Sequence, residues 1–169
     1  METLISGGRD MTERGTPAEF ALWVQPHLTA MTRYAARQVT PADRDDVVQE
    51  ALIRAWQRWE TYDESRGAPV AWLIGIVADR CRRQRTRQPA RALVELVESG
   101  APPPTYDVDL ERALGDLGRR QRQAVDLHYF VGLDVATVAA VMGCAPGTVK
   151  ATLHQARARL RELLGDDDD

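Results

Sequence analysis

Apolar residues recur at intervals of three and four along most of the chain, and Pro and Gly separate the periodic stretches. This spacing is typical of amphipathic α-helices, whereas the alternation that marks strands is weak. The pattern therefore predicts an all-α protein whose helices each bury one face.

Three helices are predicted in the first half of the chain. The first opens at TPAE, which begins with Thr16, and its apolar positions continue to Ala35. Thr, Pro and Glu at these positions form an N-terminal capping box with proline at the first helical residue. TPAD at Thr40 repeats the device and opens a second helix that runs to Trp56. A third helix starts near Pro69, and three helices suffice to close one small core.

The character of the chain changes after this unit, where three consecutive prolines, residues 102–104, interrupt helical periodicity. We therefore expect two small helical domains, residues 16–88 and 108–164, joined by a flexible linker over 89–107. Residues 1–15 are expected to be a disordered N-terminus and residues 165–169 an acidic tail. With such a linker, the domains should pack on each other only when a partner holds them.

The second domain contains a helix-turn-helix pattern. Asp134 is placed to cap a short helix, Gly143 supplies the turn, and Pro146 starts a longer helix. The buried stripe of that helix is predicted to be Val149, Leu153, Ala156 and Leu160, and its open face Pro146, Thr148, Lys150, Ala151, His154 and Arg157. In the helix before the motif, Ala124, Val125, Leu127 and Tyr129 are predicted to point inward. An ordinary helical hairpin with a charged face is the simpler alternative.

The charged residues are segregated into acidic and basic segments along the chain, and this distribution bears on function. The net charge of the 169 residues is −3, yet residues 80–91 carry six arginines and no acid. Residues 117–161 carry seven bases against two acids, while residues 41–64 carry seven acids against three arginines. One such run usually marks a solvated helix face, but two basic blocks, one on a helix-turn-helix, favour nucleic-acid binding.

Several classes of function are disfavoured by the composition. Cys81 and Cys144 form neither a disulfide framework nor a metal-ligand spacing, and a redox pair would require the two domains to meet. The three histidines lie on different predicted helices, so we expect no catalytic centre, no metal and no cofactor. Because no signal peptide or membrane-length apolar run is present, we expect a cytoplasmic protein.

Two long segments carry a family resemblance. The stretch DDVVQEALIRAW, residues 45–56, followed by AWLIGIVADRCRRQRTR, resembles region 2 of extracytoplasmic-function (ECF) sigma factors. The stretch from ALGDLGRRQRQAV to RARLREL resembles their region 4. The resemblance covers about residues 17–164 in the expected order. It implies a non-enzymatic subunit of bacterial RNA polymerase that recognises promoters, opens the strands and initiates transcription.

The resemblance also implies roles for individual residues. The clamp helices of core RNA polymerase would bind Asp45, Asp46, Gln49 and Glu50, and its flap would contact region 4. The −10 promoter element would contact Ser65, Arg66, Asp79, Arg80, Arg83 and Arg87. The −35 element would be read in the major groove by Pro146, Thr148, Lys150, Ala151, His154 and Arg157. An anti-sigma factor is a further candidate partner, and neither a membrane nor a small-molecule substrate is implied.

Two other functions compete with this interpretation. A free-standing dimeric repressor or activator would use only the helix-turn-helix and would bind duplex DNA without polymerase. A nuclease would need carboxylates or histidines that converge on a metal. The segment DDVVQEALIRAW argues against the first, and the placement of the acids on a helix face argues against the second.

Overall fold

The computed structural model describes residues 15–87 and 108–165, and every regular element in these two ranges is helical. The prediction of an all-α protein is therefore confirmed. The expected linker over 89–107 lies outside the described residues, as do residues 1–14 and residues 166–169 of the expected tail.

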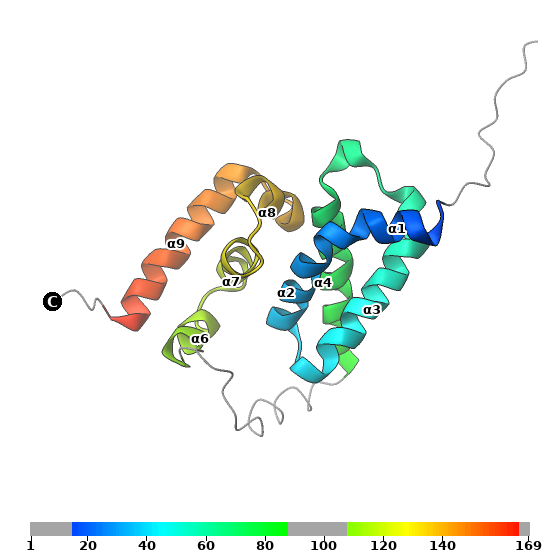
Figure 1. Cartoon of the computed structure of the whole chain (residues 1–169). Helices are drawn as coiled ribbons and strands as arrows, with labels where there is room; N and C mark the ends of the chain where they lie inside the picture. Colours follow the sequence, from blue (N-terminus) through cyan, green and yellow to red (C-terminus); the bar gives the residue numbers. More distant parts are fainter. Residues whose placement is uncertain (1–14, 88–107, 166–169) are drawn as a thin grey trace, which may run out of the picture.

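The N-terminal domain is a bundle in which α2, α3 and α4 pack on one another (Figure 1). Its buried side chains include Met31, Ala51, Leu73, Ile74 and Val77, which come from these three helices. The elements of the domain are α1 (Pro17–Val24), η1 (Gln25–His27), α2 (Leu28–Gln38), α3 (Pro41–Arg58), η2 (Trp59–Thr61), η3 (Glu64–Arg66) and α4 (Pro69–Arg87).

The two predicted capping boxes have different outcomes. At α1 the box forms, since the Glu19 backbone N–H donates to Thr16 Oγ1 at 3.3 Å and the Thr16 N–H donates to Glu19 Oε2 at 2.6 Å. At α3 the Thr40 hydroxyl instead donates to Asp43 Oδ2 at 2.9 Å. Asp43 also accepts a hydrogen bond from Gln84 Nε2 at 2.8 Å, so it ties α3 to α4.

The first predicted helix is broken near its middle. Instead of one helix from Thr16 to Ala35, α1 ends at Val24 and a 3₁₀ turn precedes α2. Pro26 lies in that turn. Proline lacks an N–H, and its ring clashes with the preceding turn of an α-helix, which explains the break.

An aromatic cluster fills the space between α1, the end of α3 and the start of α4. The Phe20 ring lies 5.3 Å from that of Trp56 and 5.4 Å from that of Trp59, in edge-to-face geometry. Trp23 contacts both Tyr62 and Trp72. Edge-to-face contacts of this kind stabilise beyond the area that they bury.

The C-terminal domain is built around its last and longest helix. Helix α9 packs against α6, α7 and α8, and its buried side chains are Val149, Leu153 and Ala156. Leu160 is half-buried. The elements are α6 (Val108–Gly115), α7 (Arg119–Val125), η4 (Asp126–Phe130), α8 (Val135–Met142) and α9 (Pro146–Leu164).

The element η4 is a π-helical turn, and it corrects one prediction. Val131 N–H donates to the Asp126 carbonyl at 2.9 Å, five residues back. Because a π turn holds more residues than an α turn, it shifts the phase of the following side chains. Leu127 is buried as expected, but Tyr129, predicted to point inward, is 51% exposed.

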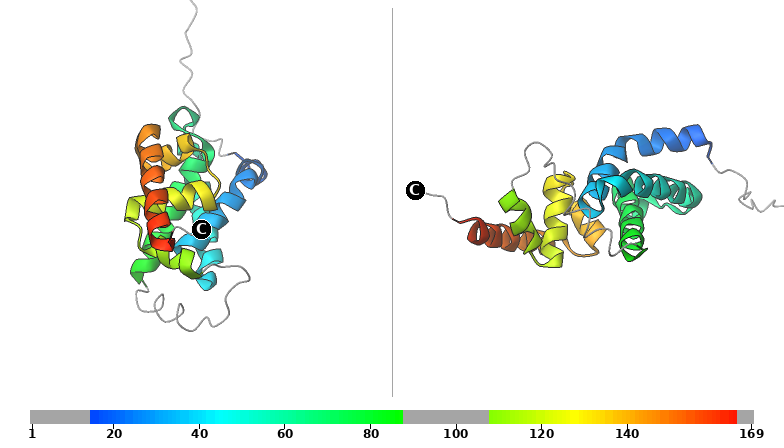
Figure 2. Two further views of the ribbon diagram at one scale, coloured as in Figure 1. Left: turned by 90° about the vertical axis from the view of Figure 1, so that its left-hand side faces the viewer. Right: turned by 90° about the horizontal axis from the view of Figure 1, so that it is seen from below.

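The two domains lie against each other, which differs from the expected independence. Helix α4 packs on α8, and α2 packs on η4, so the buried residues of both domains form one continuous cluster. Figure 2 shows the same arrangement from two further sides, with α9 at one end and α1 and α3 at the other. The packing of the two domains was not predicted, because no local sequence pattern indicates that α4 contacts α8 or that α2 contacts η4.

Candidate nucleic-acid interface

The first candidate surface is the acidic face of α3, formed by Asp45, Asp46, Gln49 and Glu50. All four side chains are exposed, whereas the neighbouring Val47, Val48 and Ala51 are buried. The spacing of the helix therefore turns its apolar side inward and leaves the acids in solvent, as predicted. On this face Arg44 Nε pairs with Asp45 Oδ1 at 2.9 Å.

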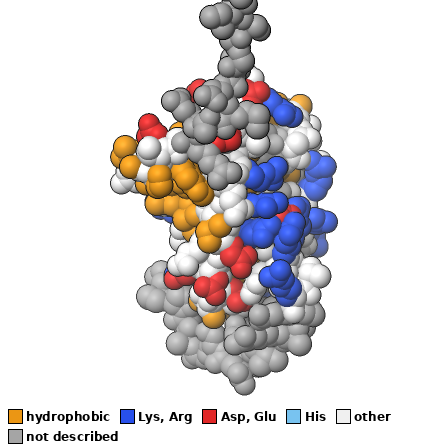
Figure 3. Space-filling view, turned by 90° about the vertical axis from the view of Figure 1, so that its right-hand side faces the viewer, with side chains coloured by type: hydrophobic (Ala, Val, Ile, Leu, Met, Phe, Trp, Pro, Cys, Tyr) orange, Lys and Arg blue, Asp and Glu red, His pale blue; other side chains and the backbone are white. Residues whose placement is uncertain are grey.

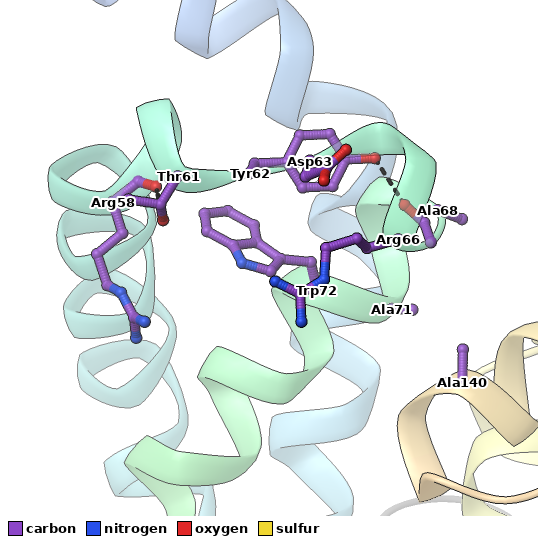
Figure 4. A pocket seen from close by; sticks show the side chains of 10 residues that line it. Arg58, Thr61, Tyr62, Asp63, Arg66, Ala68, Ala71, Trp72 and Ala140 are labelled. Carbon is purple, nitrogen blue, oxygen red and sulfur yellow. Dashed lines mark hydrogen bonds between the residues drawn. The ribbon is translucent and has the colours of Figure 1, made fainter.

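The second surface is a pocket of about 430 Å³ between the loop after α3 and the start of α4. We call it the loop pocket (Figure 4). Trp72 lies at its centre, with the guanidinium groups of Arg58 and Arg66 on either side. The lining residues are Arg58, Thr61, Tyr62, Asp63, Arg66, Gly67, Ala68, Ala71, Trp72 and Ala140.

Two side chains fix the shape of this loop. The Tyr62 hydroxyl donates to the Gly67 carbonyl at 2.9 Å, and Asp63 Oδ1 accepts from the Ser65 backbone N–H at 2.9 Å. The hydrogen bonds from Ser65 lower the pKa of Asp63. Gly67 has a φ of 148°, which L side chains rarely adopt. These two hydrogen bonds stabilise the loop in this shape.

Trp72 contributes both to the core and to the pocket. Its ring lies 6.0 Å from Trp23 and 5.4 Å from Tyr62, in agreement with the core role that its apolar periodicity indicates. The half-buried ring also lines the loop pocket. Arg58 and Tyr62, which line the same pocket, were not predicted. Only their place just before the loop DESRGAP, residues 63–69, could have indicated them.

The predicted −10 residues do not form one group. Arg66 lines the loop pocket, while Arg80 and Arg87 line a separate depression of about 290 Å³ with Glu50 and Arg54. The Arg80 side chain is only 15% exposed. Its Nε is buried with no hydrogen-bond partner among residues 15–87 and 108–165.

Asp79 organises the arginines of α4. Its carboxylate pairs with Arg80 Nη2 at 3.2 Å, Arg82 Nη2 at 3.3 Å and Arg83 Nε at 3.1 Å. Burial raises the pKa of Asp79, but the hydrogen bonds and charges of these arginines outweigh it, so the net shift is downward. Arg83 and Arg87 are exposed, and Figure 3 shows Lys and Arg side chains gathered along one side of the molecule.

The third surface is the open face of α9. Asp134 Oδ1 accepts from the Thr137 N–H at 2.8 Å and caps α8, and Gly143 has a left-handed φ of 63° in the turn. Helices α8 and α9 meet at 99°, within the range of helix-turn-helix motifs. All six residues predicted for the open face are exposed: Pro146, Thr148, Lys150, Ala151, His154 and Arg157.

A buried polar contact between the domains escaped prediction. Arg37 Nε on α2 donates to Asp126 Oδ1 at 2.9 Å, and Arg37 Nη1 donates to Glu111 Oε1 at 2.7 Å. Burial raises the pKa of Asp126, and the Arg37 guanidinium opposes that rise. The one sequence signal is an acid at an inward position of the apolar run AVDLHYF.

Other kinds of site find no support in the described part of the chain. No group of three or more His, Cys, Asp or Glu side chains there could hold a metal ion. No single described helix is long and apolar enough to cross a membrane, although α8 and α9 pass that test as a bent pair, as packed core helices also do. Cys81 is buried and Cys144 is half-buried, and both are free.

Comparison with known proteins covers both domains. Residues 23–91 match the family model of sigma-70 region 2, and residues 107–160 match that of sigma-70, region 4. The RNA polymerase sigma-E factor of Streptomyces coelicolor is 33% identical over 89% of this chain and 88% of its own length. The ECF RNA polymerase sigma factor SigL of Mycobacterium tuberculosis is 33% identical over 82% of this chain and 84% of its own length.

Solved structures agree with these matches. CnrH, in complex with the cytosolic domain of CnrY, aligns with a TM-score of 0.66 and 30% identity over 92% of both chains. The sigma factor RpoE of Bartonella quintana, in complex with the anti-sigma factor NepR, aligns with a TM-score of 0.66 and 28% identity. That alignment covers 88% of this chain and 98% of RpoE.

Proposed function

Because the chain belongs to the ECF sigma-70 family and directs promoter recognition and transcription initiation by RNA polymerase, we propose that its three surfaces divide this work. One surface binds polymerase, one binds the melted strand and one binds duplex DNA. The main support for this proposal is that each surface is exposed and that each belongs to a different element: α3, the loop before α4, and α9.

The acidic face of α3 is the polymerase-binding surface in this proposal. Asp45, Asp46, Gln49 and Glu50 are exposed next to a buried stripe, so they are available without any unfolding of the core. Their charge suits a basic partner and repels DNA phosphates. The docking site on polymerase is the clamp helices.

The loop pocket and the arginines of α4 bind the melted −10 strand. The volume of about 430 Å³ lies within the range of small-ligand cavities, and it can admit one unstacked nucleotide. The Trp72 ring offers a face for base stacking, while Arg58 and Arg66 can pair with phosphates. The exposed Arg83 and Arg87 lie farther along α4 and would make a second set of phosphate contacts, and Ser65, Asp79 and Arg80 complete the proposed −10 surface.

The open face of α9 reads the −35 element in the major groove. Thr148, Lys150, Ala151 and His154 occupy the N-terminal part of the helix, which is the part that contacts base edges in helix-turn-helix proteins. Lys150 and Arg157 supply the positive charge for phosphates. Because polymerase and promoters are cytoplasmic, we place the protein in the cytoplasm, and we infer that the polymerase flap and an anti-sigma factor are further partners.

Binding to core polymerase, followed by run-off transcription, tests the first of these three roles, which is the docking of the acidic face of α3 on polymerase. The template is a promoter fragment selected from genomic DNA with the wild-type chain. The double variant Asp46→Ala with Gln49→Ala should bind core polymerase about tenfold more weakly, because we expect both side chains to belong to the minority of interface residues whose truncation costs more than about 1 kcal/mol. Its circular dichroism should be unchanged, since both side chains are exposed.

The matched control removes an exposed acid and an exposed amide elsewhere, at Asp116 and Gln25. This control should bind polymerase normally. Equal binding by the Asp46 and Gln49 variant and the wild type would show that the docking surface lies elsewhere. DNA binding by the wild type that needs no polymerase would instead favour a free-standing regulator.

A further inference from the structure

A depression of about 290 Å³ lies between α3 and α4, apart from the loop pocket. We call it the arginine notch, because three arginines line it: Arg54 from α3, and Arg80 and Arg87 from α4. Arg54 lies outside the loop pocket and outside the residues assigned to the −10 element. The other lining residues are Glu50, Ile53 and Gln57 of α3.

Arg80 is held in place but is incompletely paired. Its side chain is only 15% exposed, and its Nη2 donates to Asp79 Oδ2 at 3.2 Å. Arg82 and Arg83 share the same carboxylate. Arg80 Nε is buried and has no hydrogen-bond partner in the two described ranges of the chain. A guanidinium that is buried with so little compensation costs free energy, and a further anion nearby would reduce that cost.

The other two arginines of the notch are available to a ligand. Arg54 and Arg87 are exposed, and neither forms an ion pair with a residue that the structure describes. With Arg80 they bring three guanidinium groups to a depression whose described lining includes one carboxylate, Glu50. Figure 3 views the molecule from the side on which α1 and α3 lie in Figure 1, and Lys and Arg side chains gather there. The notch therefore favours an anion.

A phosphate group fits this arrangement better than a carboxylate does. Guanidinium groups from two helices can donate to different oxygens of one tetrahedral phosphate, whereas one or two of them already saturate the two oxygens of a carboxylate. The volume of about 290 Å³ is at the lower limit of pockets for drug-sized ligands, so the notch suits a phosphate rather than a whole nucleotide. It is also open to solvent, as a phosphate that projects from a polymer requires.

The notch lies within reach of a strand that enters the loop pocket. Arg54 and Arg58 are four residues apart on α3, so their side chains share one face of the helix, and Arg58 lines the loop pocket. On α4, the rise from Trp72 to Arg80 is about 12 Å at 1.5 Å per residue. At the duplex spacing of 3.4 Å per phosphate, this rise corresponds to about three or four phosphates of one strand.

We propose that the arginine notch binds one backbone phosphate of the strand whose base enters the loop pocket. Arg54 is then a further nucleic-acid-binding residue, which acts with Arg80 and Arg87 of the facing helix. One attachment for a base and one for a phosphate fix the position of the strand along α4. That the phosphate belongs to the melted strand rests on the proposed function, whereas phosphate binding by the notch does not.

The experiment measures, by fluorescence anisotropy, how salt affects binding of a labelled oligothymidine to the free, full-length chain. The test variant is Arg54→Gln with Arg87→Gln, because both side chains are exposed and their replacement should leave the circular dichroism unchanged. Arg80 is kept, since it is mostly buried and shares Asp79. Affinity should fall about tenfold, as expected for two exposed charge pairs. The slope of log affinity against log salt should decrease by about 0.7, the value for one phosphate of a single strand.

Two further variants serve as controls. Arg33→Gln with Arg112→Gln removes two exposed arginines, from α2 and α6, and so changes the net charge equally. This control should have the slope of the wild type. Arg54→Lys with Arg87→Lys keeps both charges but loses the planar forks, so it should keep the slope and recover part of the affinity.

An unchanged slope in the Arg54→Gln with Arg87→Gln variant would overturn the proposal. A decrease of about 1.4 would also overturn it, because the two arginines would then contact separate phosphates. If millimolar inorganic phosphate at constant ionic strength weakens oligothymidine binding by the wild type but not by this variant, the occupant is a free anion instead. The same result with a hexaglutamate peptide would make the occupant an acidic protein segment.

The measurement contains no polymerase and no duplex DNA. Failure of the arginine notch would therefore leave the roles proposed for the acidic face of α3 and for α9 unchanged.

Discussion

Asp79 is one carboxylate shared by three arginines of α4, in the helix proposed to hold the melted strand. Its side chain is 37% exposed, so water screens each pair, and such pairs are worth at most about 1 kcal/mol. A phosphate can therefore displace the carboxylate. We propose that Asp79 then orients Arg82 and Arg83 and limits binding to DNA of any sequence.

This role predicts that Asp79→Asn strengthens non-specific binding of single-stranded DNA. Loss of one competing anion should raise the affinity about threefold, which corresponds to about 0.7 kcal/mol. The measurement is fluorescence anisotropy with a labelled oligothymidine. Asp116→Asn, which removes the same charge from an exposed site between α6 and α7, should change the affinity little. Weaker binding by Asp79→Asn would indicate direct contact between its carboxylate and the bases.

At the scale of the element, local sequence chemistry predicted helices well wherever the decisive interactions were also local. The Thr16 capping box, the Asp134 cap and the left-handed Gly143 form as their sequence patterns indicate. Three local features differ from their predictions, and one of them is the capping box at Thr40, where the hydroxyl donates to Asp43 Oδ2 instead of capping α3. Pro26 breaks a run whose apolar periodicity alone predicts one helix, and the π turn at Asp126–Phe130, which packs against α2, has no recognisable pattern in the sequence.

The predicted surfaces on α3 and α9 are exposed for the same reason, since helical spacing alone decides which side chains face outward. The loop pocket could not be predicted in this way. It requires the Tyr62 to Gly67 hydrogen bond and the approach of Trp72 from α4, and the spacing of residues along one helix does not encode such contacts.

The separate roles of α4 and α9 predict different responses to a pre-melted promoter. Arg83→Glu with Arg87→Glu should impair initiation even on a pre-melted template, because the strand-binding face itself is changed. Arg80 is left intact, since a new acid at this mostly buried position would disturb the packing of α4.

The double variant Lys150→Ala with Arg157→Ala makes the corresponding change on α9. This variant should initiate transcription much better on the pre-melted template than on duplex DNA, because it has lost only the recognition of duplex DNA. On duplex DNA, each phosphate contact removed should reduce the slope of log affinity against log salt by about 0.9. If the pre-melted template rescues both sets equally, or neither, α4 and α9 do not divide the work as proposed.

At the scale of the whole molecule, the packing of the two domains was the least predictable feature. The two domains meet through Arg37 of α2, which is far in the sequence from its partners Asp126 and Glu111. Periodicity marks Arg37 only as a polar position on α2. The acid at position 126 interrupts an apolar run without indicating its partner. Long-range ion pairs of this kind become visible only in three dimensions.

The packing of the two domains, which we call the closed form, predicts how run-off transcription depends on the concentration of the chain. If polymerase selects the open form, the apparent dissociation constant equals the intrinsic one divided by the open fraction. Arg37→Gln raises that fraction, so it should lower the concentration that gives half-maximal run-off transcription. For an open fraction of about one tenth in the wild type, the shift approaches tenfold. The maximum should not change, because saturating polymerase complexes contain the same open chain. Arg33→Gln should behave like the wild type. A higher maximum at an unchanged half-saturating concentration would instead place the effect of Arg37 after polymerase binding, at strand opening.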